Sequence, residues 1–374
     1  MGELKNDIQR LRVRRQRVLD GKYNCIPFPF RRFRRLFPGI EQEKFLVITA
    51  NQKIGKSKFT DYMLVYEPLF FSMEHPELKV KILYFTLEMS PSAKRDEFYC
   101  HLLYRLDNIR ISPTDLRSTD QERPVDEMVE FIDEDKNPTG INKRCRDYAL
   151  SHGHLNFKEV DVVDPLGDSK ITKRRVVDSD NPYTPDDPEE YRIVIVDNAS
   201  NLALESGMKK MENIDKLAKY GIILRNQLKY IFVLIQHQAQ AQEGIENQKL
   251  NKIKPSSDGL ADCKTTTRDA NFVLGLYSPY KYGLREYEGY DITKFGNFIR
   301  FMEVIEDRDY GASNNICPLF FDGAASTFAE LPRADDKEGL ERVYTYIQTL
   351  KQPKKKGVSF FIKSIKSLLN KKNG

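Results

Sequence analysis

The order of apolar and polar residues predicts strands and helices that alternate along most of the chain. Four apolar runs have the length and continuity of strands buried on both faces of a parallel sheet, at residues 45–48, 80–86, 191–197 and 231–235. Apolar residues recur at helical spacing between them, at 59–70, 92–106, 124–150 and 214–228. Further strands are predicted at 157–163, 271–277, 298–305, 319–321 and 327–331. The pattern indicates an α/β fold, with a mainly parallel sheet flanked by helices and antiparallel strands at its C-terminal edge.

The N-terminal region follows a different pattern. Residues 4–19 carry a thin apolar stripe at helical spacing among five arginines. A helix of this kind cannot fold alone, so it must dock on its own domain or on a neighbouring subunit. Residues 26–39 mix phenylalanines, arginines and prolines. This composition favours an extended connector whose rings pack on the core, and a nucleic-acid patch is the alternative.

The sequence also contains two long polar segments and an amphipathic C-terminal segment. Residues 165–188 predict a surface excursion with one hairpin near 171–177, and the loop 239–268 is either functional or disordered. An amphipathic helix near the C-terminus could touch a partner, a membrane surface or the protein itself. We therefore divide the chain into a basic linker helix, a main domain and a basic amphipathic tail, at residues 1–25, 26–335 and 336–374.

Composition and net charge exclude few classes of protein or partner. The 374 residues are 40% hydrophobic, which is enough for a proper core, and the net charge is only +5. Both ends are basic, which suits a polyanion, although a solvated charged tail is the commoner explanation. The five cysteines are widely spaced, which is typical of reduced thiols. The five histidines do not cluster with them, and His152 and His154 are more typical of a polar loop than of half a metal site. Neither a secretory signal nor a membrane span is evident, so we expect a cytoplasmic protein.

The stretch 45–59 predicts a phosphate-binding loop between a strand and a helix. It fits G-x-x-x-x-G-K-[ST] with Ala50 at the first glycine. Backbone N–H groups would surround the phosphates, with Gly55 allowing their approach. Lys56 would reach the β- and γ-phosphates of ATP, and Ser57 would bind Mg²⁺. The residues expected to contact the nucleotide are Ala50, Asn51, Gln52, Lys53, Ile54, Gly55, Lys56, Ser57 and Lys58.

Polar residues at the ends of three later strands are candidates for the same site. Glu88 follows the strand at 80–86, where it could activate the attacking water or merely favour the start of the next helix. Asp197 ends the strand at 191–197, as expected of a second Mg²⁺ ligand. Gln236 follows the strand at 231–235 and could sense the γ-phosphate, unless it is simply a polar loop residue.

Taken in this order, the motifs resemble those of the RecA-like ATPase domain of DnaB-type replicative helicases, over about residues 26–331. The resemblance rests on Y-F-T-L-E-M-S, I-V-I-V-D-N and V-L-I-Q-H-Q beside the phosphate loop. It continues in the long match from Leu260 to Tyr277 and in E-D-R-D-Y-G at 306–311. The phosphate loop alone would not discriminate among NTPases.

The resemblance implies a homo-oligomeric ring, of six subunits, with ATP bound between neighbours. Arg308 would then act as an arginine finger on the adjacent subunit's ATP, and the helix at 4–19 would latch onto the next protomer. Single-stranded DNA would pass through the central channel, near Lys209, Lys210, Lys249 and Lys252. We expect no part of residues 1–374 to correspond to the family's helical N-terminal domain, on which primase docks, so the sequence does not identify a replication or loading partner.

Three functions remain in view from the sequence. The leading hypothesis is an ATP-driven helicase-like motor on single-stranded DNA. The second is a recombinase-like protein that uses ATP as an assembly switch to coat or load DNA. The third is a regulatory RecA-like ATPase that engages a protein partner. Unwinding with steady ATP turnover favours the first, coating without unwinding the second, and hydrolysis indifferent to DNA the third.

Overall fold

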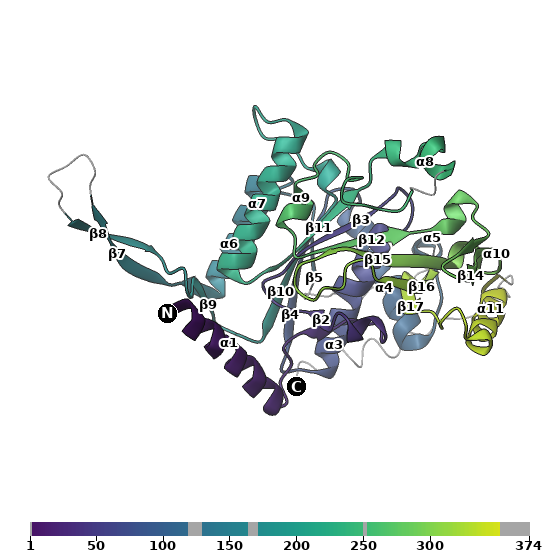
Figure 1. Ribbon diagram of the computed structural model, residues 1–374, viewed down its shortest axis with the longest axis horizontal. Coiled ribbons are helices and arrows are strands. Elements are labelled where there is room, and N and C mark those ends of the chain that lie inside the picture. Colours follow the sequence, from purple (N-terminus) through teal and green to yellow (C-terminus); the bar gives the residue numbers. More distant parts are fainter. Residues whose placement is uncertain (1, 119–128, 164–170, 250–252, 352–374) are drawn as a thin grey trace.

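Within the residues that the computed structural model describes, 2–118, 129–163, 171–249 and 253–351, nine strands form one central sheet (Figure 1). Their order across the sheet is β17-β16-β15-β12-β3-β11-β10-β4-β5. Neighbours from β12 to β5 run parallel, and β15, β16 and β17 are antiparallel. The strands are β3 (Phe45–Ala50), β4 (Lys79–Thr86), β5 (Val129–Ile132), β10 (Glu190–Asp197), β11 (Ile231–His237), β12 (Phe272–Tyr277), β15 (Ile299–Asp307), β16 (Ile316–Asp322) and β17 (Thr327–Glu330). The predicted fold class is therefore confirmed.

Alternate residues of the buried strands serve the two faces of the sheet. In β3, Leu46 and Ile48 pack into one hydrophobic cluster, while Phe45 and Val47 pack into another. The first face is covered by α2 (Lys56–Asp61), the π-helical turn η2 (Tyr62–Tyr66), α3 (Glu67–Glu74), α4 (Pro91–Asp107) and α5 (Pro113–Arg117). The second is covered by α6 (Pro138–Ser151), α7 (Lys210–Leu228) and α9 (Thr266–Asp269). Burial on both faces explains why these strands are almost continuously apolar.

A third cluster extends the core beyond the antiparallel strands. Leu340 and Ile347 of α11 (Lys337–Lys351) pack there with Phe295 and Phe320. The smaller elements of this region are η5 (Pro279–Tyr282), β13 (Glu286–Tyr287), β14 (Tyr290–Asp291), α10 (Ile292–Phe295) and η6 (Gly296–Phe298). The amphipathic helix predicted near the C-terminus lies outside the described residues. Among the described helices, none is long and apolar enough to cross a bilayer.

The segment before the first sheet strand is the predicted connector. It includes β1 (Ile26–Pro27), η1 (Phe33–Arg35) and β2 (Gly39–Ile40), and β1 pairs with β2. Its four phenylalanine rings are buried in the core, whereas its arginines 31, 34 and 35 face solvent. Ahead of it, α1 (Gly2–Leu19) projects from the body and leaves Leu11 and Val18 exposed (Figure 1).

Two expectations from the pattern are wrong in detail. The helix predicted at 124–150 is confirmed only from Pro138 onward, because 129–132 form the edge strand β5 beside β4. Asn137 starts α6 by accepting a hydrogen bond from the Gly140 N–H, and Pro138 occupies its first turn. The strand predicted at 157–163 is confirmed as β7 (Phe157–Val163), which lies outside the central sheet. The hairpin predicted near 171–177 is wrong in detail, because these residues form one strand, β8 (Ile171–Val177), which pairs with β7 in a projecting hairpin (Figure 1).

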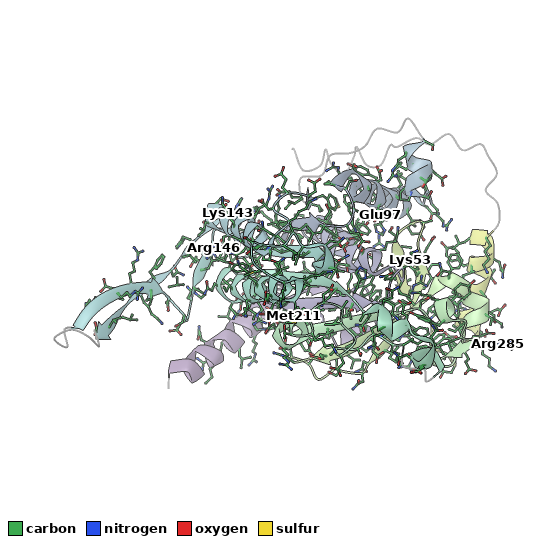
Figure 2. The ribbon with its side chains drawn as sticks, turned by 90° about the horizontal axis from the view of Figure 1, so that it is seen from above. Lys53, Glu97, Lys143, Arg146, Met211 and Arg285 are labelled. Carbon is green, nitrogen blue, oxygen red and sulfur yellow. The ribbon has the colours of Figure 1, made fainter. Side chains whose placement is uncertain are left out.

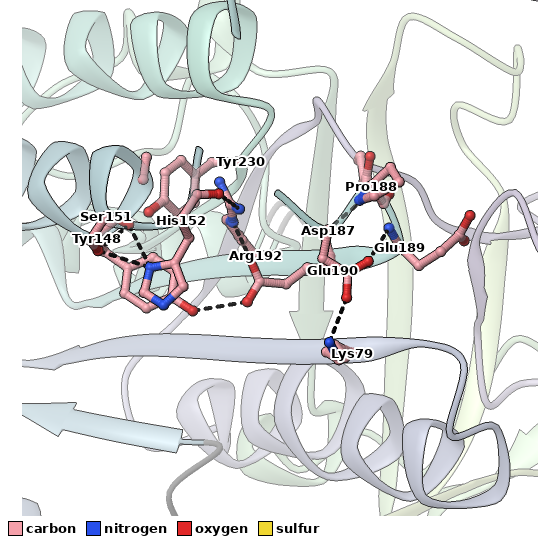
Figure 3. A network of polar contacts seen from close by, with 12 residues as sticks. Lys79, Tyr148, Ser151, His152, Asp187, Pro188, Glu189, Glu190, Arg192 and Tyr230 are labelled. Carbon is pink, nitrogen blue, oxygen red and sulfur yellow. Dashed lines mark hydrogen bonds and ion pairs between the residues drawn. The ribbon is translucent and has the colours of Figure 1, made fainter. Parts of the chain in front are cut away.

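The buried side chain of Arg192 connects the residues next to this hairpin with the central sheet (Figure 3). Arg192 of β10 donates to the Tyr183 hydroxyl at 2.6 Å and to the His152 carbonyl at 3.0 Å, and it pairs with Glu190. Tyr183 belongs to β9 (Tyr183–Pro185), which pairs with β6 (Gly153–Leu155) next to the hairpin. Tyr148 of α6 also donates to Glu190, at 2.9 Å. The network ties the excursion to both a strand and a helix of the main body.

A buried histidine makes the stability of the fold depend on pH. His101 of α4 is stacked on Tyr66, with ring centroids 4.2 Å apart, and its Nδ1 lies 3.2 Å from the Ala325 carbonyl oxygen. Burial lowers the pKa of His101 to about 4. A histidine in the unfolded chain titrates near pH 6.5, so the unfolded state takes up a proton first as the pH falls.

We expect acidification from pH 7.5 to pH 5 to remove about 2 kcal/mol of unfolding free energy through His101. His101→Gln, which cannot titrate, should lose correspondingly less over the same interval. Urea unfolding of both proteins at the two pH values measures the difference. Equal losses in the two proteins would contradict the assignment.

Candidate nucleotide-binding site

Strand register brings the predicted site residues to one edge of the sheet. Asp197 at the end of β10 is level with Thr86 of β4 and Ile235 of β11, and His237 of β11 is level with Ala50 of β3. The phosphate-binding loop, Glu88 and Asp197 thus all follow the carboxyl ends of adjacent parallel strands. This is the edge at which open α/β sheets bind their ligands.

The phosphate-binding loop is held by residues from the antiparallel strands. Gly55, with φ of 98°, precedes the first turn of α2, and a Cβ there would come within 3.2 Å of the Phe321 ring. Arg300 donates to the Ile54 carbonyl at 2.7 Å and stacks on Phe321 with its guanidinium 4.5 Å from the ring centroid. Burial lowers the pKa of Arg300 to about 10. The loop is therefore braced from beneath by a buried cation and an aromatic ring.

Asp197 is joined directly to the phosphate-binding loop. Ser57 Oγ donates to Asp197 Oδ1 at 3.1 Å, and the Tyr84 hydroxyl donates to Oδ2 at 2.9 Å. Burial would raise the pKa of Asp197, but the charges of Lys94 and Lys56 outweigh it and hold the pKa below its usual value. The carboxylate is thus ionised, although it is almost completely buried.

Lys56 is buried in the same cluster. Burial lowers the pKa of Lys56, while the negative charges of Asp197 and Glu88 act in the opposite direction. An ammonium group with so little solvent gains more from an incoming phosphate than an exposed one does, because it has less water to lose. The position therefore suits a residue that neutralises phosphate charge.

Glu88 stands at the open side of the cluster, where about half of its side chain is exposed. The Asn198 amide donates to Glu88 Oε2, and it lies 3.1 Å from His237 Nε2. Asn198 is itself fixed, since its Oδ1 accepts the Ser200 N–H of η3 (Ala199–Asn201) at 3.0 Å. A solvent-accessible carboxylate held in one orientation can receive a proton from a water molecule.

Comparisons with solved structures bear on the fold. No protein-family model and no curated protein matches the sequence. Among solved structures, one described as an ATPase domain is 13% identical, with a TM-score of 0.57 over 87% of this chain and 99% of that one. A DnaB-like replicative helicase, solved in a study of its interactions with primase, is also 13% identical, with a TM-score of 0.57 over 86% of this chain and 67% of that one. The chain has the RecA-like fold of a DnaB-type ATPase domain.

In this RecA-like domain, the motifs did not predict Asn198 and His237, the two residues that contact Glu88. Asn198 directly follows Asp197, and His237 directly follows Gln236. For His237, the signal was the alternation of side chains along a strand. Ile235 is level with Asp197 on the neighbouring strand, and His237, two residues further along, lies on the same face of the sheet as Ile235. Burial and the Lys56 charge lower the pKa of His237, so its ring is neutral near pH 7.

Gln236 occupies a different place from the one expected of a phosphate sensor. It is completely buried, and its amide donates to the carbonyls of Ala261 and Cys263, each at 2.6 Å. Its Oε1 accepts the Thr266 hydroxyl at 2.8 Å. All these bonds lie within the protein, so Gln236 fixes the loop before α9, and His237 takes the place beside Glu88.

The remaining residues of the phosphate-binding loop fall into two groups. Lys53 and Gln52 are exposed, and Lys53 is labelled in Figure 2. Asn51 is buried and donates to the Tyr282 hydroxyl at 2.6 Å and to the Ile253 carbonyl at 3.0 Å. Lys58 pairs with Glu97 at 3.0 Å and therefore points away from the loop's mouth. The side chains of Ala50 and Ile54 are buried in the core.

The donor set fits a magnesium ion. Ser57 and Asp197 place a hydroxyl and a carboxylate oxygen 3.1 Å apart, and Mg²⁺ prefers one or two such oxygens together with water and substrate phosphates. The described residues contain no group of three or more metal-ligating His, Cys, Asp or Glu side chains. A pocket with so few protein ligands suits a metal that arrives with a nucleotide.

Arg308, Lys209 and Lys210 lie outside this cluster. Asp307 pairs with Phe272, near the amino end of β3, so Arg308 is at the edge of the sheet opposite its own phosphate-binding loop. Its exposed guanidinium donates to the Arg268 carbonyl. Lys209 and Lys210 are exposed at the start of α7, where Lys210 pairs with Asp262 at 3.1 Å. Lys249 ends α8 (Ile245–Lys249), and Lys252 lies outside the described residues.

We expect Arg300→Lys to weaken binding of a fluorescent ATP analogue by about tenfold, because lysine cannot replace the planar contacts that hold the Ile54 carbonyl. Equilibrium fluorescence titration gives the affinity, and circular dichroism checks the fold. Arg285→Lys is the matched control, since Arg285 is exposed (Figure 2). Unchanged affinity in a folded Arg300→Lys protein would show that the brace is dispensable.

Proposed function

We propose that this chain is an ATP-dependent, helicase-like motor that acts on single-stranded DNA in replication and hydrolyses ATP between the subunits of a ring. The observation that carries the proposal is the Ser57–Asp197 hydrogen bond at the carboxyl edge of the sheet, with Lys56 buried beside it and Glu88 at the open side. The DnaB-type fold supports the same function.

Each residue of the cluster has a distinct part in this proposal. Lys56 neutralises the β- and γ-phosphates, and Ser57 and Asp197 hold Mg²⁺, which supplies further positive charge when it is bound. Glu88 orients a water molecule and accepts its proton. Asn198 keeps the Glu88 carboxylate in place, and His237 flanks it as a neutral ring.

The proposed ring would supply an arginine to the site of each subunit. The described residues place no arginine near Glu88 by hydrogen bond or ion pair, whereas Arg308 is exposed at the opposite edge of the sheet. A neighbour could therefore present Arg308 to the γ-phosphate, where an arginine stabilises the charge of the transition state. Leu11 and Val18 of the projecting α1 supply an apolar surface that would dock on the next subunit.

The first test measures ATP hydrolysis with and without single-stranded DNA. We expect DNA to stimulate the parent, and Lys56→Ala to abolish turnover. Glu88→Gln should lower turnover by about a hundredfold or more while it still binds the nucleotide, because only the base is lost. Lys143→Ala, which changes an exposed lysine of α6 outside the cluster, is the matched control and should remain active.

The outcome separates the three candidate functions. A parent that DNA does not stimulate would contradict the motor and favour a regulatory ATPase. DNA coating that depends on ATP, without strand separation, would favour a recombinase-like switch. Normal hydrolysis by Glu88→Gln would show that another group is the base.

The second test asks whether Arg308 acts on a neighbour's ATP. Arg308→Ala and Lys56→Ala should each be inactive alone. An equal mixture of the two should recover about a quarter of parental turnover, because about a quarter of the interfaces combine an intact Lys56 pocket with an intact Arg308. A mixture of Lys56→Ala and Glu88→Gln is the control, because both changes damage the same subunit's pocket, and it should recover nothing. Absence of recovery in the first mixture would exclude the shared site.

A further inference from the structure

A lysine is completely buried behind the proposed metal ligand. Lys94 of α4 has 2% of its side chain exposed. Its Nζ lies 2.7 Å from Asp61 Oδ2, 3.6 Å from Asp197 Oδ2 and 3.8 Å from Glu97 Oε2. The ammonium group also lies 4.8 Å from the centroid of the Tyr84 ring. A charge this deep is costly to bury unless specific partners surround it.

Lys94 links the three elements that carry the site. Asp61 is in α2, directly after the phosphate-binding loop, and Asp197 ends β10. Lys94 itself is in α4, the helix that follows Glu88. A change in the position of its ammonium group would therefore reach the loop, the metal ligand and the proposed base together.

The two oxygens of Asp197 have different surroundings. Oδ1 accepts the Ser57 hydroxyl at 3.1 Å and faces the phosphate-binding loop. Oδ2 accepts the Tyr84 hydroxyl at 2.9 Å and faces Lys94. One oxygen is thus committed to the interior, and the other is available for a ligand beside Ser57.

We propose that Lys94 is a positioning residue of the metal site, whose fixed positive charge turns Asp197 Oδ1 toward Ser57 and weakens the attraction of Asp197 for Mg²⁺. This rests on the proposed function, because it assumes that Ser57 and Asp197 hold the ion with a bound nucleotide. A cation already paired with the carboxylate repels a second cation. The protein alone therefore binds Mg²⁺ weakly, and the ion enters and leaves with the nucleotide phosphates.

A purely structural role makes a different prediction. If Lys94 only neutralised buried carboxylates, its replacement would lower the stability of the fold and leave the magnesium dependence of nucleotide binding unchanged. The half-saturating Mg²⁺ concentration for binding a fluorescent N-methylanthraniloyl ADP separates the two roles. This measurement needs no hydrolysis, so it is independent of Glu88.

We expect Lys94→Met to lower the half-saturating Mg²⁺ concentration by about fivefold or more, because the competing charge is gone. Asp61→Asn should raise it, since Lys94 keeps its charge but loses its nearest carboxylate. The double variant Lys94→Met/Asp61→Asn removes the pair without leaving a lone buried charge, and it should stay below the parent. Circular dichroism confirms folding of each variant.

Opposite shifts for Lys94→Met and Asp61→Asn support the proposal. Values within twofold of the parent, or a rise for either variant that lacks Lys94, overturn it. If no protein without Lys94 folds, Asp61→Asn decides, and an unchanged value overturns the proposal. A parent that binds the fluorescent ADP without any dependence on Mg²⁺, or not at all, contradicts the proposed function itself, and the inference about Lys94 falls with it.

Discussion

The register of four parallel strands is the constraint on which the site depends. Because Ile48, Thr86, Asp197 and Ile235 lie at the same level of the sheet, groups far apart in the sequence meet at one edge. In a sheet whose side chains alternate, a slip of one residue in β10 would turn Asp197 away from Ser57. Continuous burial on both faces fixes that register, so the apolar core determines the geometry of the polar cluster.

The charged residues of the polar cluster are buried, and positive and negative side chains stabilise one another there. Lys56 and Lys94 lie among Asp61, Asp197 and Glu97, and each ion depends on its neighbours for the interactions that solvent would otherwise give. Removal of one member therefore changes the electrostatic field at all the others. Under the proposed function, hydrolysis and stability are coupled at this point, because both depend on the same contacts.

The fold and the main site residues are predictable from the sequence, since both depend on local patterns. Strand ends and the phosphate-binding motif are visible along the chain, and they point to Lys56, Glu88 and Asp197. Lys94 was not predicted, because a lysine in a helix usually faces solvent and its partners come from separate elements. The pattern of β7 predicts a strand but does not reveal its pairing partner, which is β8 and not the main sheet. Ring assembly and the action of Arg308 across subunits stay predictions.

Arg300 and Phe321, which support the phosphate-binding loop, come from a part of the sequence far from it. Arg300 and Phe321 contact a loop that precedes them by more than two hundred residues, Arg300 at the Ile54 carbonyl and Phe321 beneath Gly55. A ribosome releases the loop long before it releases these partners, because synthesis proceeds from the N-terminus. The nascent chain therefore cannot brace its phosphate-binding loop until the antiparallel strands have emerged, and a polypeptide truncated before Arg300 would carry the motif without its support.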